Sequence, residues 1–224
     1  MKQSYRHILN SIKIDKKGRE DVLGVPFYRF YYDKNEEVVE AVKKLNYRPN
    51  NTNHIWEGVH GDGVGGSDLY NYEGFGNLFA WLQDCMAEVA EDLKIPNKLV
   101  CNAAWSHLNK PNEFFYDHTH YNCMFSSNYY CTGHANDMTQ WFYPNPYFHY
   151  TNIYPLGDYE ENKYMLTFTE PTEPGKFIVF PPMIRHRAWT NTSDEDRITI
   201  AANWFPTGNI NASGVSHLNL DVIQ

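Results

Sequence analysis

The sequence predicts a mainly β protein with flanking helices, and two observations carry that prediction. From about Leu99 onward the chain is a series of short segments rich in β-branched and aromatic residues, separated by turn signals such as residues 110–112 (KPN) and 173–175 (EPG). Before Leu99, apolar residues recur at helical spacing in two stretches. Many short strands at such spacing favour a sandwich or a barrel over a βαβ sheet.

The two stretches before Leu99 are expected to be helices. Residues 36–46, EEVVEAVKKLN, begin with acidic side chains and end with lysines, which is the charge order that a helix dipole favours. In the stretch from Phe75 to about Leu93, apolar residues recur every three or four positions, and Pro96 follows shortly. We expect both helices to pack against a sheet.

A glycine-rich run at residues 61–66, GDGVGG, formally matches G-x-G-x-x-G. A dinucleotide site requires that pattern to join a buried strand directly to a helix. Gly74 interrupts the chain before the predicted helix begins, so we interpret the run as a mobile surface loop, with a lid as an alternative.

Six later segments are predicted as strands. Each is short and contains β-branched or aromatic residues. In chain order they read LVCNAAWSHL, EFFYDHTH, CMFSSNYYC, KYMLTFTE, GKFIVFPP and DRITIAANWF.

Composition limits the classes of partner. The 224 residues carry 19 Lys and Arg against 27 Asp and Glu, a net charge of −8, which argues against a nucleic-acid polymer as partner. The N-terminus lacks the apolar segment of a secretory signal, and no run approaches the roughly 18 apolar residues of a membrane span. The four cysteines lack C-x-x-C spacing, so free thiols and a cytoplasmic location are expected.

The segment FFYDHTHYN, residues 114–122, places two histidines two positions apart. In a strand, His118 and His120 would share one face and Asp117 would point to the other. The pair could be two surface imidazoles or two ligands of one metal ion. Taken alone, His186 fits a core or rim histidine, and Arg197 fits the edge of a sheet.

The order of these residues resembles that of the non-haem Fe(II), 2-oxoglutarate-dependent oxygenases, and in particular a small phage and bacterial branch with an H-x-H…H…R pattern. The blocks that carry the likeness are HTHYNCMFSSNYY, from residue 118, and PGKFIVFPPMIRHRAWTNTSDEDRITIAANW, from residue 174. The likeness covers roughly residues 99–205. It implies a double-stranded β-helix, or jelly roll. We expect one domain, 1–224, in which 1–97 supply support helices and a loop, 98–206 form the jelly-roll catalytic core, and 207–224 are a C-terminal tail.

The resemblance implies a role for each candidate residue. Three histidines would hold Fe(II), and Arg197 would bind the far carboxylate of 2-oxoglutarate through the two parallel hydrogen bonds that a guanidinium can donate. Thr199 would add a hydroxyl to that carboxylate, and O₂ would complete the reaction, with succinate and CO₂ as co-products. The expected metal ligands are His118, His120 and His186; the expected cosubstrate contacts are Arg197, Thr199, Tyr130, Asn128 and Ser126; and Asn203 and Trp105 are weaker candidates for the pocket wall.

The sequence also departs from the family pattern. His120 stands where the superfamily usually has a carboxylate ligand, so the site would be one unit more positive and would suit zinc almost as well. Asp117 could replace His120 only through a bulge. Residues 133–157 look like an insertion, in which His134 and His149 are expected not to be ligands.

Three functions follow from these observations. The leading one is an Fe(II) and 2-oxoglutarate-dependent dioxygenase that hydroxylates an unidentified small-molecule or peptide substrate. The alternatives are a cupin-like jelly-roll metal-binding module and a zinc-dependent isomerase or hydrolase. Arg197 favours the oxygenase, because a cupin without redox activity has no need of a carboxylate anchor. No membrane partner is expected, the oligomeric state stays open, and the aromatic run QWFYPNPYFHY fits either a substrate wall or a dimer contact.

Overall fold

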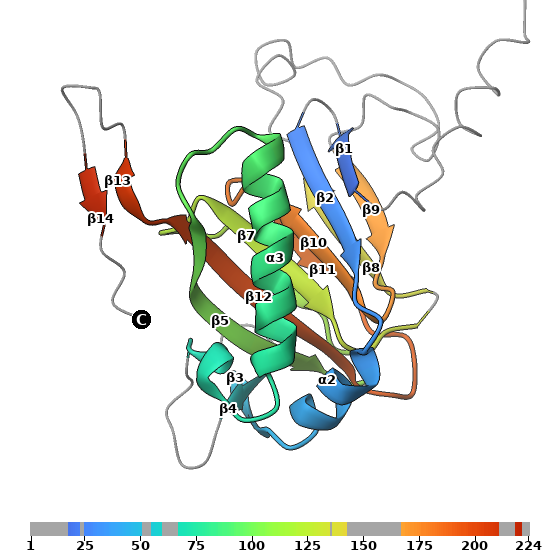
Figure 1. The fold of residues 1–224 in the computed structure, drawn as a ribbon. Coiled ribbons are helices and arrows are strands. Elements are labelled where there is room, and N and C mark those ends of the chain that lie inside the picture. Colours follow the sequence, from blue (N-terminus) through green and yellow to red (C-terminus); the bar gives the residue numbers. More distant parts are fainter. Residues whose placement is uncertain are drawn as a thin grey trace, which may run out of the picture.

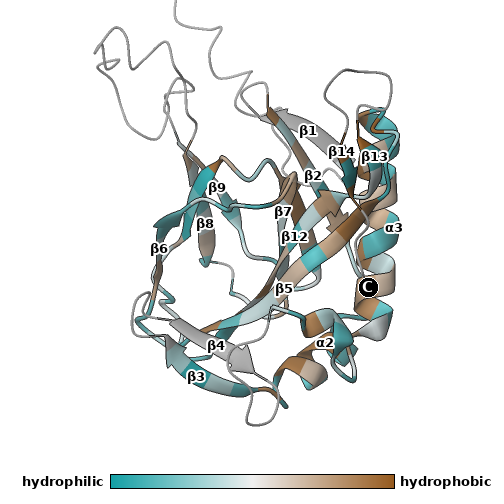
Figure 2. Ribbon diagram, turned by 90° about the vertical axis from the view of Figure 1, so that its left-hand side faces the viewer, coloured by the Kyte–Doolittle hydropathy of each residue, from teal (hydrophilic) through white to brown (hydrophobic). Residues whose placement is uncertain are grey.

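Two antiparallel sheets and a long helix form three layers in the computed structural model (Figures 1 and 2), which describes residues 18–22, 25–50, 55–59, 67–134, 136–142, 167–210 and 218–220. Helix α3 (Gly76–Asp92) covers one face of the larger sheet, and the smaller sheet lies on the other side. The mainly β fold class and the jelly-roll arrangement of two sheets are thereby confirmed.

The larger sheet has eight strands and the smaller one four. In spatial order the larger sheet contains β1 (Gly18–Val22), β2 (Val25–Tyr31), β10 (Lys176–Phe180), β7 (Phe125–Tyr130), β12 (Arg197–Pro206), β5 (Leu99–Asn109), β4 (Ile55–Val59) and β3 (Asn46–Asn50). The smaller sheet contains β6 (Phe115–His118), β11 (Arg185–Ala188), β8 (Met138–Phe142) and β9 (Thr167–Pro171). The remaining elements are the hairpin β13 (Gly208–Ile210) and β14 (Leu218–Leu220), helix α2 (Asn35–Val42) and the 3₁₀ turn η1 (Leu69–Asn71).

Strand β10 shows why a central strand can carry apolar side chains on both faces. Successive side chains of a strand point to opposite faces. Phe177 and Val179 therefore enter the core beneath the helix layer, whereas Ile178 and Phe180 enter the core between the two sheets. Both faces are buried, so KFIVF is buried at every position and lacks the polar alternation of a half-exposed strand.

Strand β12 uses the same alternation to place polar groups inside the molecule. Ile198 and Ile200 belong to the core under α3. The residues between and before them, Arg197 and Thr199, line a pocket between the sheets. The apolar face anchors the strand, and the polar face is thereby held in the interior.

The N-terminal part of the chain differs from the expected support helices and loop. α3 agrees with the predicted helix from Phe75 to Leu93, but α2 ends at Val42 and β3 begins at Asn46, so the helix expected over residues 36–46 is shorter. In addition, β1–β4 hydrogen-bond into the larger sheet through β2–β10 and β4–β5 pairing. The first 97 residues thus contribute strands to the same sheet as the core.

Part of the expected insertion is also an integral element of the fold. Residues 138–142 form β8, which pairs with both β11 and β9 in the smaller sheet. The prediction of an insertion over residues 133–157 is therefore wrong for β8. Residues 61–66, His149 and the end of the aromatic run from residue 143 lie outside the described residues.

A buried ion cluster joins the two sheets at one edge. Arg29 of β2 donates to both carboxylate oxygens of Glu170 of β9, over 2.7 and 3.0 Å. Lys176 of β10 places its Nζ 3.2 Å from Glu170 Oε1. All three side chains are at most 1% exposed, so they form a charged link inside the molecule.

Two further findings concern the whole described part of the chain. None of the four cysteines is in a disulfide, as expected from their spacing. Among the described helices, none combines the length and apolar character needed to cross a bilayer.

Candidate metal centre and adjoining pocket

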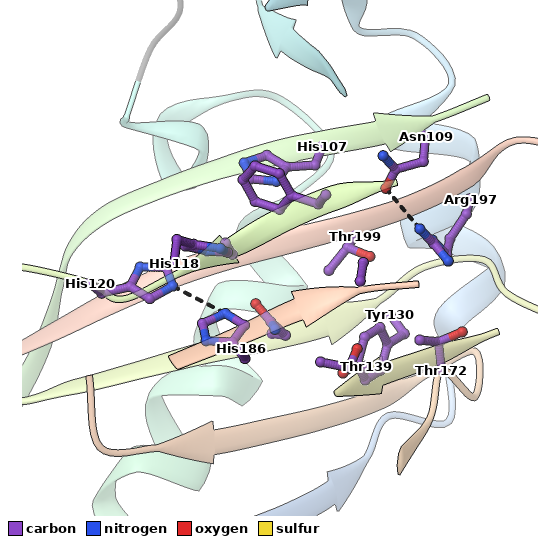
Figure 3. A pocket seen from close by; sticks show the side chains of 14 residues that line it. His107, Asn109, His118, His120, Tyr130, Thr139, Thr172, His186, Arg197 and Thr199 are labelled. Atoms are coloured by element: carbon purple, nitrogen blue, oxygen red, sulfur yellow. Dashed lines mark hydrogen bonds between the residues drawn. The ribbon is translucent and has the colours of Figure 1, made fainter. Parts of the chain in front are cut away.

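Three histidines converge at one end of the space between the sheets (Figure 3). His118 ends β6, and His186 lies directly opposite it on β11. One ring nitrogen from each of His118, His120 and His186 lies within 4.8 Å of the others, and Nε2 of His120 is 3.4 Å from Nε2 of His186. Three imidazole nitrogens facing one point are a donor set that suits Fe(II), zinc and related ions.

His120 reaches this point by a route that differs from the expected one. The strand ends at His118, so His120 lies two residues beyond it and not on the same strand face. Its backbone N–H donates to the carbonyl of Pro182, 3.0 Å away, in the turn before β11. The tether to that turn, and not strand alternation, therefore brings the two histidines of H-x-H together.

Backbone carbonyls orient two of the three rings. Nδ1 of His118 is 3.0 Å from the Tyr116 carbonyl, and Nδ1 of His186 is 3.1 Å from the Ile184 carbonyl. A carbonyl only accepts, so each Nδ1 carries the proton and each Nε2 keeps a free lone pair. Such support for the second ring nitrogen is typical of metal-binding histidines.

The three rings are uncharged at neutral pH. Burial lowers the pKa of His118 and of His186, and burial together with the neighbouring His118 lowers the pKa of His120 to about 3. Neutral imidazole is the form that binds a metal ion, so no proton has to leave these rings when an ion binds.

Asp117 is directed away from the three nitrogens. Its Oδ2 is 3.1 Å from Nη1 of Arg185, and both side chains are substantially exposed. The arrangement favours His120 over Asp117 as the third donor. His134 forms a loose pair with Glu195 at 3.7 Å and lies outside the triad.

A pocket extends from the triad to Arg197, and it contains most of the expected cosubstrate contacts (Figure 3). Asn128, Tyr130, Arg197 and Thr199 all line it. Ser126 does not: it shares the strand face of Asn128 but donates to Asn203 Oδ1, 3.1 Å away, in the interior. The structure therefore places four of the five expected cosubstrate residues at the pocket.

Arg197 is buried and held by acceptors of the chain itself. Its Nη2 donates to the Trp189 carbonyl over 2.7 Å and to Asn109 Oδ1 over 3.2 Å. Its Nη1 donates to Asp137 Oδ1 over 3.3 Å. Burial lowers the pKa of Arg197, and the Asp137 carboxylate opposes that shift, so the guanidinium stays charged.

Several pocket residues were not predicted from the sequence. His107 and Asn109 of β5 line the pocket together with Thr139 and Thr172. Nε2 of His107 and Nδ2 of Asn109 are buried and have no hydrogen-bond partner among the described residues. Buried polar atoms are normally satisfied, so both atoms mark places where a ligand or water would be bound.

A signal for His107 and Asn109 was present in the sequence. Trp105, proposed as a pocket wall, lies at alternate positions with His107 and Asn109 in WSHLN, so all three share a strand face. The Trp105 ring itself contacts the rings of His107 and His120, with centroids 5.9 Å apart in both cases. It supports the histidines from outside the pocket.

The chain was then compared with known proteins. A family model described as 2OG-Fe(II) oxygenase matches residues 103–203, the span that runs from β5 to β12 and contains the triad and Arg197. No curated protein matches the chain.

Solved structures share the fold at low sequence identity. A prolyl-4-hydroxylase from Pseudomonas putida is 11% identical, with a TM-score of 0.53, over 84% of this chain and 96% of that one. HygX from Streptomyces hygroscopicus, with nickel, 2-oxoglutarate and hygromycin B bound, is 10% identical, with a TM-score of 0.58, over 92% and 88%. A prolyl hydroxylase from Trichoplax adhaerens, in complex with a hypoxia-inducible-factor peptide, is 11% identical, with a TM-score of 0.54, over 80% and 83%.

Proposed function

Because the family model and the structural neighbours both point to the 2-oxoglutarate-dependent Fe(II) oxygenases, we propose that this chain hydroxylates a small-molecule or peptide substrate by that chemistry. The observation that carries the proposal is one pocket with three neutral imidazoles at one end and a buried arginine at the other. A metal ion needs the imidazoles, and the far carboxylate of a dicarboxylic 2-oxo acid needs the arginine.

In this proposal, His118, His120 and His186 hold Fe(II) through their Nε2 atoms. When bound, Fe(II), 2-oxoglutarate and O₂ would supply the oxidative decarboxylation to succinate and CO₂ and the oxygen atom for the substrate. Arg197 and Thr199 attract the far carboxylate and fix the direction in which the cosubstrate lies.

The pocket wall between these ends would orient the cosubstrate and exclude water. Tyr130 and Thr139 join their hydroxyls over 2.8 Å, and burial raises the pKa of Tyr130, so that hydroxyl keeps its proton. Asn128 lies beside Tyr130 on the wall, and the unsatisfied Nδ2 of Asn109 is a further donor. Neutral donors around a buried arginine form a site for an anion.

The test is anaerobic binding of Fe(II) and 2-oxoglutarate, followed by the weak visible charge-transfer band of the chelate. We expect the band in the wild-type protein, its loss in His186→Ala, and a far higher cosubstrate requirement in Arg197→Ala. His134→Ala removes an imidazole outside the triad and is the matched control, which should leave the band unchanged. Failure of the wild-type protein to give the band would contradict the proposal.

A second function is favoured by the chemistry of the donors. Three neutral imidazoles without a carboxylate also suit zinc, as in a hydrolase, an isomerase or a cupin-like binding module. That function predicts tight zinc binding that depends on His186, with no effect of 2-oxoglutarate and no role for Arg197 in ligand binding. The same variants therefore decide between the two.

A further inference from the structure

A buried carboxylate already faces the arginine that is proposed to bind the cosubstrate. Asp137 Oδ1 is 3.3 Å from Arg197 Nη1, and each side chain is 1% exposed. The two residues are 60 positions apart, and Asp137 lies in the loop before β8, a strand of the smaller sheet. The interior thus holds a carboxylate of the chain itself beside the arginine that is expected to bind the cosubstrate.

The hydrogen bonds of the guanidinium show what this means for an incoming anion. Nη2 has two hydrogens, and the Trp189 carbonyl and Asn109 Oδ1 accept both. A carboxylate that forms two parallel bonds to arginine needs two adjacent N–H groups, and each accessible edge of the guanidinium includes an Nη2–H. The two-bond pairing expected from the sequence is therefore not open while these contacts persist.

Asp137 is fixed in place and cannot readily turn away. Its Oδ2 accepts the backbone N–H of His134 over 3.0 Å, and its carbonyl accepts the backbone N–H of Thr172 over 3.0 Å. Gly133 presses the same loop against Thr172, because a Cβ at residue 133 would overlap the Thr172 carbonyl. The carboxylate is built into the loop on both sides.

We propose that Asp137 is a resident counter-ion of Arg197 that weakens binding of the far carboxylate of the cosubstrate and so sets the affinity of the pocket for dicarboxylic 2-oxo acids. This inference rests on the proposed function. Asp137 does so in two ways: it neutralises the arginine, and it repels a second carboxylate at close range. Asp137 therefore affects the choice between 2-oxo acids, because neither effect weakens the binding of a 2-oxo acid that lacks a far carboxylate.

The test uses the full chain loaded with redox-inert Ni(II) and measures ligand binding by isothermal titration calorimetry. The probes are 2-oxoglutarate and pyruvate, a 2-oxo acid that lacks the far carboxylate. Asp137→Asn keeps the shape of the side chain and removes its charge, so we expect about tenfold tighter binding of 2-oxoglutarate and unchanged binding of pyruvate. Asp84→Asn, on the exposed side of α3, makes the same change in net charge away from the pocket and should alter neither affinity.

Each outcome of the calorimetry supports or overturns the inference about Asp137. Unchanged or weaker binding of 2-oxoglutarate by Asp137→Asn would overturn the inference and leave Asp137 as a group that orients Arg197. Equal tightening of both probes would also overturn it, since the effect would not depend on the far carboxylate. A wild-type protein that binds neither 2-oxo acid would instead refute the proposed function itself.

The substitution could also unfold the metal-loaded protein, because it leaves Arg197 buried without a counter-charge. In that event the near-ultraviolet circular dichroism of Asp137→Asn is measured with each probe. The inference requires that 2-oxoglutarate restore the folded signal and that pyruvate fail to do so, because only the former replaces the missing carboxylate. Absence of rescue by 2-oxoglutarate would overturn it.

Discussion

Replacing Glu170 by Gln should destabilise the protein severely, because it removes the negative charge that two buried cations share. Arg29 donates two hydrogen bonds to Glu170, and Lys176 lies 3.2 Å from it without hydrogen-bond geometry, so the lysine is held by charge. Glu173, 3.8 Å from Lys176, is 43% exposed and compensates poorly. Removing one partner of a buried ion pair costs about 3–5 kcal/mol.

Urea unfolding followed by tryptophan fluorescence measures this loss. For a chain of this size about 3–5 kcal/mol corresponds to a fall in Tm of roughly 6–20 °C. The matched control is Glu40→Gln, which breaks an exposed pair with Lys43 and should change the free energy of unfolding by less than about 0.5 kcal/mol. If Glu170→Gln proves as mild as Glu40→Gln, the cluster does not hold the two sheets together by charge.

Three further predictions follow from the site and the core. In the metal-free protein, the free energy of unfolding should fall as the pH drops below about 6.5, because the unfolded chain takes up protons at His107 and His120 that the native rings, with pKa values of about 3, do not. Urea unfolding at pH 7, 6 and 5 measures how steeply the free energy of unfolding changes with pH. This dependence should be weaker in His120→Asn than in the wild-type protein, by up to about 1.4 kcal/mol per pH unit, and equal dependence in the two proteins would contradict the prediction. Ser127→Ala should cost about 1–3 kcal/mol by depriving buried Trp204 Nε1 of its acceptor at 2.8 Å, and little of that cost should remain when Trp204→Phe is the background. Ni(II) at a hundred times its Kd should raise the free energy of unfolding of the wild-type protein by about 2.7 kcal/mol; an equal rise in His186→Ala would exclude His186 as a ligand.

Local patterns in the sequence predicted much of the fold. The apolar spacing from Phe75 matches α3 because one side of that helix is buried against the sheet. Strand β8 was missed because MTQWF is too short and too polar for a periodic signal, and its pairing with β11 and β9 decides its conformation. The edge strands β1 and β3, GREDV and NYRPN, have equally little intrinsic preference for strand.

The resemblance to the family and the three histidines could be predicted from the order of motifs, and a model of that family matches residues 103–203. The partners of Arg197 could not be. Asn109 meets it through the pairing of β12 with β5, across 88 residues, and Asp137 meets it from the loop before β8, across 60 residues. No local pattern in the sequence records either contact. Burial of Arg197 does not by itself require an external anion, since the chain supplies an anion of its own.

The positions of the charges suggest a relation between the two unusual features of the pocket. His120 stands where a carboxylate ligand is usual, so the metal end lacks one negative charge, whereas Asp137 adds one at the arginine end. The net charge of the two ends together is the same as in a site with a carboxylate ligand at the metal and an arginine without a counter-ion. That net charge suits a dianionic cosubstrate.

This relation makes a prediction about charge exchange along the pocket. His120→Asp should weaken binding of 2-oxoglutarate to the Ni(II)-loaded protein, because both ends then carry a protein carboxylate. Adding Asp137→Asn should restore the affinity towards the wild-type value, because the negative charge has then moved from Arg197 to the metal. Calorimetry on the single and double variants measures this directly. A double variant as weak as His120→Asp alone would show that the geometry of the third donor, and not the charge balance of the pocket, limits binding.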